Sequence, residues 1–366
     1  MGAFMSTADT SQKDEVPTQL LEEYDQYETE KVLENQLMNY YQSLSKHESD
    51  LSAVETSFIP VVRASIINIM GKKQCESYKK YNAFTSTDLS ILRSIHKLPH
   101  FNADKHNEVN HLIEPLKRAF QVGSMDQVAT TIENMKNIQI YKGNPFTTID
   151  YQLLDIIEYI SNFCVRHHNL HSKPFIHWTH IFDILFRGTN IKLTNHKSKF
   201  SITDDSDISN DTILFQCHAQ QTTTDYGRQN NIELATCGMT MNMLNATQLE
   251  NDDREAIFQS HSVLVNKSIL EELTISSYRI NDSTEDVFPI GIQLIGYVGY
   301  LYSVKPYKGV YVASQVCENT LFIPQTLAEF QSFLYNDHIL EMLCNLKRHY
   351  VNIAKVVRRA SFNRGI

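Results

Sequence analysis

Two carboxylates flank the start of a short apolar segment in the second half of the chain. Asp225 lies in a polar, turn-like stretch, and Glu233 follows in the segment Ile232-Glu-Leu-Ala-Thr-Cys237, which has the composition of a strand. Carboxylates that converge beside an ammonium group bind Mg²⁺ and support phosphodiester hydrolysis. No Lys or Arg follows Glu233 within this segment, so the candidate ammonium is Lys267 on the next expected helix. Asp225, Glu233 and Lys267 are therefore the candidate catalytic set of a Mg²⁺-dependent nuclease.

The elements expected around this segment follow the order αβββαβ. A helix over 175–186 precedes candidate strands at 190–194, 212–218 and 232–237, and a long helix over 248–274 comes next. Residues 287–323 are β-branched or aromatic and are divided by Gly, Pro and Lys turns, which predicts an antiparallel meander. This order is the one expected of a restriction-endonuclease-like core.

Several short segments of residues 175–325 are similar to those of a known family. They are Ile181-Phe-Asp-Ile-Leu-Phe-Arg-Gly188, Gly227-Arg228, Ile232-Glu-Leu-Ala-Thr-Cys237, Gln259-Ser-His-Ser-Val-Leu-Val-Asn-Lys-Ser-Ile-Leu270 and Val298-Gly-Tyr-Leu-Tyr302. On these segments the chain resembles a lineage-expanded family of uncharacterised proteins of early-diverging fungi, which has a PD-(D/E)XK, restriction-endonuclease-like core. The resemblance implies an acid after the Gly-Arg segment, and a second acid with Lys after the Ile-Glu-Leu segment.

The chain departs from that pattern at both places. Asn230 and Asn231 stand where the first acid-bearing strand is expected, and Gly238-Met239-Thr240 occupies the position of the second acid and Lys. These residues neither bind a hard cation nor stabilise a developing negative charge. The resemblance thus implies a degenerate scaffold that acts as a non-catalytic interaction protein and needs no cofactor. The alternative is a divergent nuclease that binds Mg²⁺ through Asp225 and Glu233, with Lys267 as a displaced lysine.

A second group of candidate ligands combines one cysteine with several histidines. On a helix Cys164 and His168 share a face, as do His167 and His171, while His177 and His180 follow after Pro174. Four such side chains can form a tetrahedral Zn²⁺ site. The competing interpretation is a His-rich helix end, where imidazolium interacts with the negative end of the helix dipole.

A basic segment raises the alternative of nucleic-acid binding without catalysis. Tyr78 and Tyr81 are interleaved with its four lysines and are candidate stacking surfaces; the lysines are Lys72, Lys73, Lys79 and Lys80. The net charge of −9 and the pI near 5.9 do not favour a general polyanion binder. Pairing of these lysines with acids of the same chain is the competing interpretation.

The C-terminal segment Arg358-Arg359-Ala360-Ser361 matches the pattern of a basophilic kinase site, so Ser361 is a candidate phosphorylation site. A solvated basic end to the last helix explains the same residues.

Composition suggests an intracellular protein. The six cysteines have no CxxC pair or regular spacing, which indicates reduced thiols. The first residues lack an apolar signal segment, and no run of about 18 apolar residues occurs. We expect a cytoplasmic or nuclear protein with a protein partner and no membrane contact.

The overall expectation is an α+β fold with a helical N-terminal region followed by a restriction-endonuclease-like mixed sheet flanked by helices. The boundaries are a disordered tail over 1–16, a helical region over 17–145, an α/β region over 146–359 and a basic tail over 360–366. Within the helical region, helices are expected over 19–45, 49–70 with an interruption at Pro60, 86–97, 103–121 and 124–137. Helices are also expected over 149–164 and from Thr326 to about Arg359.

Overall fold

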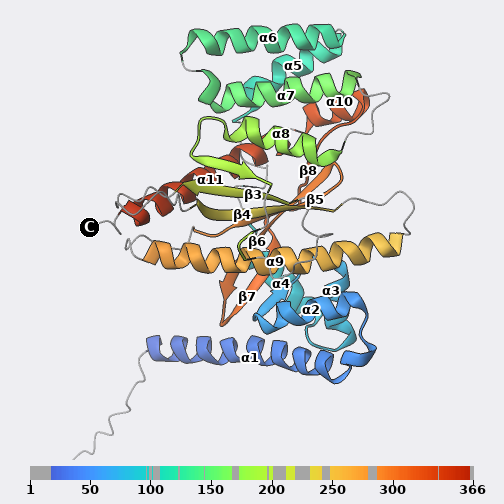
Figure 1. The fold of residues 1–366 in the computed structure, drawn as a ribbon, viewed down its shortest axis with the longest axis vertical. Coiled ribbons are helices and arrows are strands. Elements are labelled where there is room, and N and C mark those ends of the chain that lie inside the picture. The colour runs from blue at the N-terminus through green and yellow to red at the C-terminus, as the bar shows by residue number, and fades with distance from the viewer. Residues whose placement is uncertain are drawn as a thin grey trace, which may run out of the picture.

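The chain forms an α+β fold in which one mixed sheet lies between layers of helices (Figure 1). The computed structural model describes residues 18–95, 97–98, 101, 108–122, 124–143, 145–166, 173–195, 198–200, 212–218, 231–240, 248–278, 287–336 and 338–362. The expected α+β class, with a helical N-terminal region and a helix-flanked mixed sheet, is confirmed.

The sheet has eight strands in the order β1-β7-β6-β5-β4-β3-β2, with β8 paired to β6. Its strands are β1 (Ile66–Asn68), β2 (Ile191–Thr194), β3 (Thr212–His218), β4 (Asn231–Thr240), β5 (Ile290–Ile295), β6 (Val298–Tyr307), β7 (Val310–Gln315) and β8 (Leu321–Phe322). The β5, β6 and β7 strands are antiparallel neighbours, so the meander expected over 287–323 is confirmed.

The middle of the chain has the expected αβββαβ order. After α8 (Pro174–Phe186), the strands β2, β3 and β4 pair antiparallel in sequence. The long helix α9 (Gln248–Tyr278) then crosses the sheet, and β5 returns parallel to β4. A parallel return requires such a crossover, because a tight turn can join only antiparallel strands.

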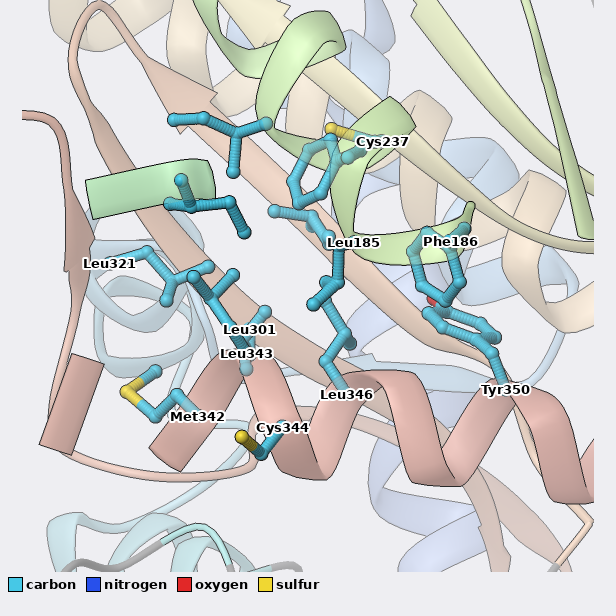
Figure 2. Packing of buried hydrophobic residues seen from close by; sticks show 14 of the residues in the cluster. Leu185, Phe186, Cys237, Leu301, Leu321, Met342, Leu343, Cys344, Leu346 and Tyr350 are labelled. Atoms are coloured by element: carbon cyan, nitrogen blue, oxygen red, sulfur yellow. The ribbon is translucent and has the colours of Figure 1, made fainter. Parts of the chain in front are cut away.

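Aromatic packing covers one face of the sheet with α8 and α11 (His338–Phe362) (Figure 2). Phe215 of β3 stacks on Tyr350 of α11 with ring centroids 5.0 Å apart, and it meets Phe186 of α8 edge-on at 5.5 Å. Cys237 of β4 lies beside Leu185 in the same cluster. Pairs of this kind contribute about 0.5–1.5 kcal/mol each beyond the burial of their area.

The α9 helix covers the opposite face of the sheet (Figure 1). Asn266 is fully buried there, and its Oδ1 accepts a hydrogen bond from the backbone N–H of Thr236 at 3.2 Å. Its Nδ2 donates to Thr236 Oγ1 at 2.7 Å and to the Tyr302 hydroxyl at 2.5 Å. Asn266 therefore fixes α9 against both β4 and β6.

The N-terminal region packs below α9 and adds one strand to the sheet (Figure 1). It contains α1 (Thr18–Lys46), η1 (Glu48–Asp50), α2 (Ala53–Arg63), α3 (Lys72–Lys80) and α4 (Ser86–Ile95). The helix expected over 49–70 is wrong at its C-terminal end, because Ile66, Ile67 and Asn68 pair in parallel with β7. The α2 helix passes through Pro60 and ends at Arg63, and Ser65 at φ 58° turns the chain into this buried strand.

A second helical layer lies beyond α8, at the top of Figure 1. It contains α5 (Asn110–Val122), α6 (Met125–Tyr141), η4 (Pro145–Thr147), α7 (Ile149–Arg166) and α10 (Leu327–Tyr335). The expected N-cap of the closing helices is present, since the Thr326 hydroxyl accepts from the backbone N–H of Glu329 at 3.2 Å.

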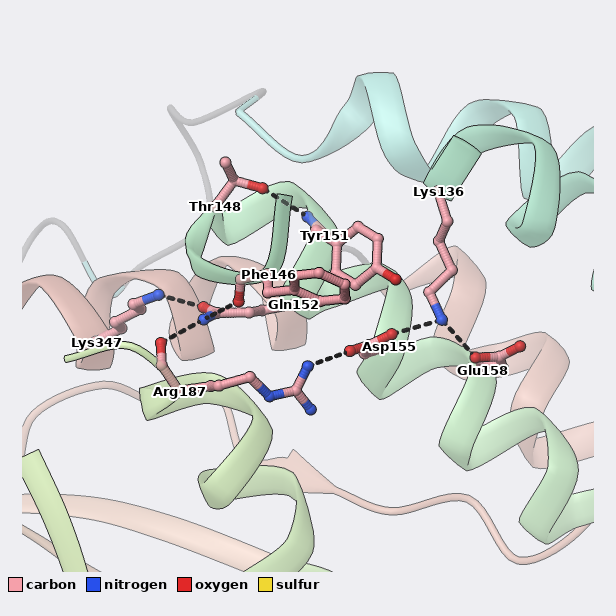
Figure 3. Close-up of polar contacts among 9 residues, drawn as sticks. All are labelled: Lys136, Phe146, Thr148, Tyr151, Gln152, Asp155, Glu158, Arg187 and Lys347. Carbon is pink, nitrogen blue, oxygen red and sulfur yellow. Dashed lines mark hydrogen bonds and ion pairs between the residues drawn. The ribbon is translucent and has the colours of Figure 1, made fainter. Parts of the chain in front are cut away.

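Polar contacts tie α6, α7 and the end of α8 together (Figure 3). Lys136 of α6 lies 2.5 Å from both Asp155 and Glu158 of α7, and Arg187 donates to Asp155 at 2.7 Å. Gln152 of α7 donates to the Arg187 carbonyl at 2.7 Å and accepts from Lys347 of α11. These contacts cross the boundary expected near residue 145, so the segments on its two sides pack as direct neighbours.

In the residues described by the structure, no helix is both long and apolar enough to cross a membrane.

Candidate functional site

Glu233, the central residue of the candidate nuclease site, is used as a structural anchor. It lies near the start of β4, opposite Gln216 of β3, beside a register shift in the strand pair. Its side chain is 3% exposed, and Ser198 Oγ donates to Oε2 at 2.5 Å while the backbone N–H of Lys199 donates to Oε1 at 2.9 Å. Both carboxylate oxygens therefore hold the segment that follows β2.

The neighbouring Lys199 extends this anchor to α9. Its Nζ lies 2.6 Å from Glu272 Oε1 and 4.9 Å from the centre of the Phe200 ring. Lys199 therefore links Glu233, through its backbone N–H, to the C-terminal part of α9, through its ammonium group.

Lys267 lies on α9 but makes its contacts toward β7. Its Nζ lies 2.7 Å from Glu271 Oε1 and 4.8 Å from the centre of the Tyr311 ring, and the Tyr311 hydroxyl donates to the same carboxylate at 3.3 Å. In the strand order, β7 and β2 lie on opposite sides of β4. The contacts of Glu233 and Lys267 thus lead to different parts of the sheet, and the structure does not join the two side chains.

Asp225, the remaining member of the nuclease set, lies outside the described residues. Within the described ranges, no group of three or more His, Cys, Asp or Glu side chains is placed to hold a metal ion.

The cysteine and histidine group is described only in part, because His167, His168 and His171 lie outside the described residues. Cys164 is buried and its Sγ donates to the Pro324 carbonyl at 3.3 Å. Burial raises the pKa of this thiol to about 12, which disfavours the thiolate that binds metal. His177 is also buried, and its Nδ1 lies 2.6 Å from the Tyr159 hydroxyl. Cys164 and His177 each have a structural partner.

The lysines of the basic segment lie on α3 and pair with acids of the same chain. Lys73 lies 2.8 Å from Asp253 of α9, and Lys80 lies 2.6 Å from Glu55 of α2. Lys72 lies 3.9 Å from Glu76, one turn along α3. Lys79 has no ion pair with a described residue. Burial raises the pKa of the nearby Cys75 thiol, and the positive charges of Arg93 and Lys79 oppose that rise.

The tyrosines of the basic segment are less available than the sequence suggested. Tyr78 is fully buried, and its hydroxyl accepts from the backbone N–H of Asn68 at 3.0 Å, so the expectation that it forms a stacking surface is wrong. The helical spacing that places Tyr78 beside two lysines also turns it inward, where its ring meets Tyr40 at 4.9 Å. Tyr81 is half-buried under Lys80.

Ser361 lies on the last turn of α11, and its side chain is not described. The phosphorylation hypothesis therefore stays a prediction.

A pocket that the sequence did not reveal lies at one edge of the sheet, between α4 and the ends of β1 and β7. Its volume is about 300 Å³, and two cationic side chains, Arg93 and Lys97, are among the residues that line it. The lining comes from segments around residues 69, 94 and 316, which only the tertiary structure brings together. The sequence carried one signal of this pocket, which is a set of polar and basic residues at helical spacing on one side of the expected helix: Ser90, Arg93, Ser94 and Lys97.

No protein-family model matches this chain, and no curated protein or solved structure is significantly similar to it.

Proposed function

We propose that this chain is a non-catalytic protein-interaction module built on an αβββαβ scaffold related to the PD-(D/E)XK nucleases. The observation that carries the proposal is the environment of Glu233, whose two carboxylate oxygens accept hydrogen bonds from Ser198 and Lys199 while the side chain is 3% exposed. A hard cation needs several oxygen ligands at short range. The Glu233 carboxylate instead holds the segment after β2 through these two hydrogen bonds.

Energetics support this assignment. A hydrogen bond to a charged group contributes about 1.5–3 kcal/mol, so a metal ion that recruited Glu233 would have to displace two such bonds from the segment after β2. Lys267 is held by Glu271 and Tyr311, so its ammonium would also have to leave its partners. The nuclease alternative requires both rearrangements together.

A surface suited to a protein partner lies at the C-terminal end of α6 and in η4. Four large apolar side chains are exposed there: Ile138 (54%), Ile140 (46%), Tyr141 (90%) and Phe146 (53%). We call these four residues the α6 patch. Exposed apolar patches mark protein-protein contact sites, and these four exposed side chains lie close together in the chain, between residues 138 and 146. The α6 helix is an outer element of the fold, so a partner can reach this patch without displacing the core (Figure 1).

The non-catalytic assignment is tested by nuclease assays with plasmid, single-stranded DNA and RNA in Mg²⁺ or Mn²⁺. We expect no cleavage by the wild-type chain. Glu233→Gln keeps the shape of the side chain and removes its charge, and Glu133→Gln is the control at an exposed position of α6. Cleavage by the wild type that disappears in folded Glu233→Gln and persists in Glu133→Gln would overturn the proposal in favour of the nuclease.

The interaction assignment is tested by placing a photo-crosslinking amino acid at Tyr141 and, as a control, at Glu133. We expect one discrete protein adduct from position 141 that is lost when Ile138 and Ile140 are both changed to Ser. Equal crosslinking from both positions, or crosslinking that survives the Ser substitutions, would contradict the α6 patch as the contact surface.

A further inference from the structure

The pocket near α4 lies where two neighbouring parallel strands end. The β1 and β7 strands pair in parallel through Asn68 and Ala313, so both chains leave the sheet at the same edge. The residues that follow, Ile69 and Met70 after β1 and Cys317 after β7, line the pocket. In open α/β sheets, ligands bind outside the carboxyl ends of the strands at a topological switch point, and this pocket likewise lies outside the carboxyl ends of two parallel strands.

The α4 helix forms the outer wall of the pocket and is held in place at both ends. Its first turn has a capping box, in which Thr85 Oγ1 accepts from the Asp88 N–H at 3.1 Å and Asp88 Oδ2 accepts from the Thr85 N–H at 2.8 Å. Beyond its last turn, the Leu98 N–H donates to the Val316 carbonyl at 2.9 Å. The wall is thereby bonded to the end of β7.

One side of α4 faces the protein core and the other faces the pocket. Leu89 and Leu92 are 1% and 2% exposed and pack in the N-terminal core. Ser90 and Arg93 line the pocket from one face of the helix, beside Ser94, whose hydroxyl donates to the Ile91 carbonyl at 2.7 Å. Across the pocket, Gln315 adds a carboxamide from β7, while the neighbouring Ser314 hydroxyl donates to the Gln315 carbonyl at 3.3 Å.

The Arg93 guanidinium is available to bind an anionic ligand in the pocket. Its Nη2 donates to the Cys75 sulfur at 3.4 Å, and no described carboxylate lies within ion-pair distance of it. The second cation, Lys97, is paired with Glu318, whose side chain is 78% exposed at the rim. Arginine carries five N–H donors in a planar fork, so a weak contact with a thiol leaves most of its donors for a ligand.

We propose that this pocket binds the phosphate group of a small organic phosphate, with Arg93 as the principal ligand. Guanidinium and hydroxyl groups together satisfy a tetrahedral oxyanion, and charge-assisted bonds from arginine to phosphate are among the strongest hydrogen bonds in proteins. Ile69 and Met70 give the remainder of the ligand an apolar contact. The volume of about 300 Å³ lies at the lower end of the range of small-molecule sites.

This inference is independent of the α6 patch. The α4 and α6 helices lie on opposite sides of the central sheet in Figure 1, and the pocket shares no residue with the patch or with Glu233. An experiment that disproves one of the two proposals therefore does not affect the other.

Binding is measured by calorimetry with three probes on the full chain: inorganic phosphate, phenyl phosphate and benzoate. We expect phenyl phosphate to bind more tightly than inorganic phosphate, because its ring reaches the apolar contact. We also expect it to bind more tightly than benzoate, because a phosphate dianion offers more acceptors to Arg93. Equal affinity for benzoate and phenyl phosphate, or no binding of phenyl phosphate at millimolar concentration, would overturn the proposal.

Arg93→Gln is expected to weaken phenyl phosphate binding by about tenfold to a hundredfold, the effect of losing a hydrogen bond to a charged group. Arg118→Gln makes the same charge change at an exposed position of α5 and should leave binding unchanged. Unaltered binding in a folded Arg93→Gln chain, shown by its circular dichroism, contradicts the assignment.

Two further variants keep the test decisive if Arg93→Gln fails to fold. Ser94→Trp adds a bulky side chain at an exposed position of the wall and should abolish binding. Glu318→Gln removes the carboxylate paired with Lys97 and should strengthen binding several-fold, because the ammonium then has no competing anion. Weaker binding in Glu318→Gln, or full binding in Ser94→Trp, would contradict the proposed position of the phosphate.

Discussion

Ser198 Oγ donates a hydrogen bond to Glu233 Oε2 at 2.5 Å, which joins the segment after β2 to the start of β4. The carboxylate is 3% exposed, so removing the donor leaves a buried charged oxygen with one partner fewer. We expect Ser198→Ala to lower the free energy of unfolding by about 1–3 kcal/mol, the cost of an unsatisfied buried group.

Urea unfolding followed by circular dichroism measures this effect. Ser332→Ala is the control, because that exposed hydroxyl donates only to a carbonyl of its own helix, Ala328, at 3.3 Å. Similar stability losses in the two variants would show that Glu233 does not depend on its partner from the segment after β2.

Gly238 allows α9 to approach β4 closely. A Cβ atom at this position would lie 2.0 Å from Cζ of Phe258, well inside a normal contact. We expect Gly238→Ala to destabilise the fold by about 1–3 kcal/mol through overpacking. Phe258→Leu makes room, so the double variant should lose less stability than the sum of the single variants. Additive losses in a double-mutant cycle would argue against this contact.

The sequence was sufficient to predict most of the regular elements. Alternating β-branched and aromatic residues divided by glycine turns predicted β5, β6 and β7, and β3 was predicted at its observed bounds, Thr212–His218. The short strand β1 was missed because Ile66, Ile67 and Asn68 continue an apolar helical pattern. Only the partner strand β7, far away in the sequence, makes these three residues a strand.

The candidate site was harder to predict, because residue type does not reveal the partners of a side chain. Glu233 and Lys267 were correctly placed on a strand and the following helix, but their partners come from Ser198, Lys199 and Tyr311. The pocket was missed for the same reason, since Arg93 meets the ends of β1 and β7 only after folding. Helical spacing alone identifies the side of α4 and not what lies across from it.

Lys136 connects two helices of the outer layer and should contribute to their stability. It lies 2.5 Å from both Asp155 and Glu158, and its side chain is 14% exposed (Figure 3). Lys136→Met keeps much of the apolar stem and leaves Asp155 with Arg187 as its remaining ion pair. We expect a loss of about 1–3 kcal/mol in the free energy of unfolding, the cost of partners left unsatisfied.

Hydrogen exchange locates the effect of Lys136→Met. Relative to the wild type, exchange should accelerate more in α6 than in α9. Lys117→Met is the matched control, because Lys117 is about as buried as Lys136, at 16% exposure, but has one half-exposed carboxylate partner, Glu114, and such pairs contribute about 0–1 kcal/mol. Equal losses in the two variants would mean that the buried partner Asp155 does not strengthen the Lys136 contacts.

Glu255 should make the fold less stable as the pH rises from acid to neutral. Burial against the sheet raises the pKa of this α9 carboxyl above its ordinary value of 4.5, and the nearby charge of Asp252 raises it further. The folded chain therefore holds the proton more tightly than the unfolded chain does. The resulting stabilisation is full below pH 4.5 and is lost as the pH passes through the raised pKa.

Glu255→Gln removes this titration and keeps an oxygen that accepts from Gln259 Nε2, which lies 3.0 Å from the carboxylate. We expect the variant to be more stable than the wild type at pH 7, with the difference shrinking toward pH 4. Urea unfolding across this pH range measures it. Glu318→Gln gives the opposite sign, because Lys97 lowers the pKa of the Glu318 carboxyl and the stabilisation is lost on acidification. A pH-independent difference between Glu255→Gln and the wild type would show that Glu255 keeps an ordinary pKa in the folded chain.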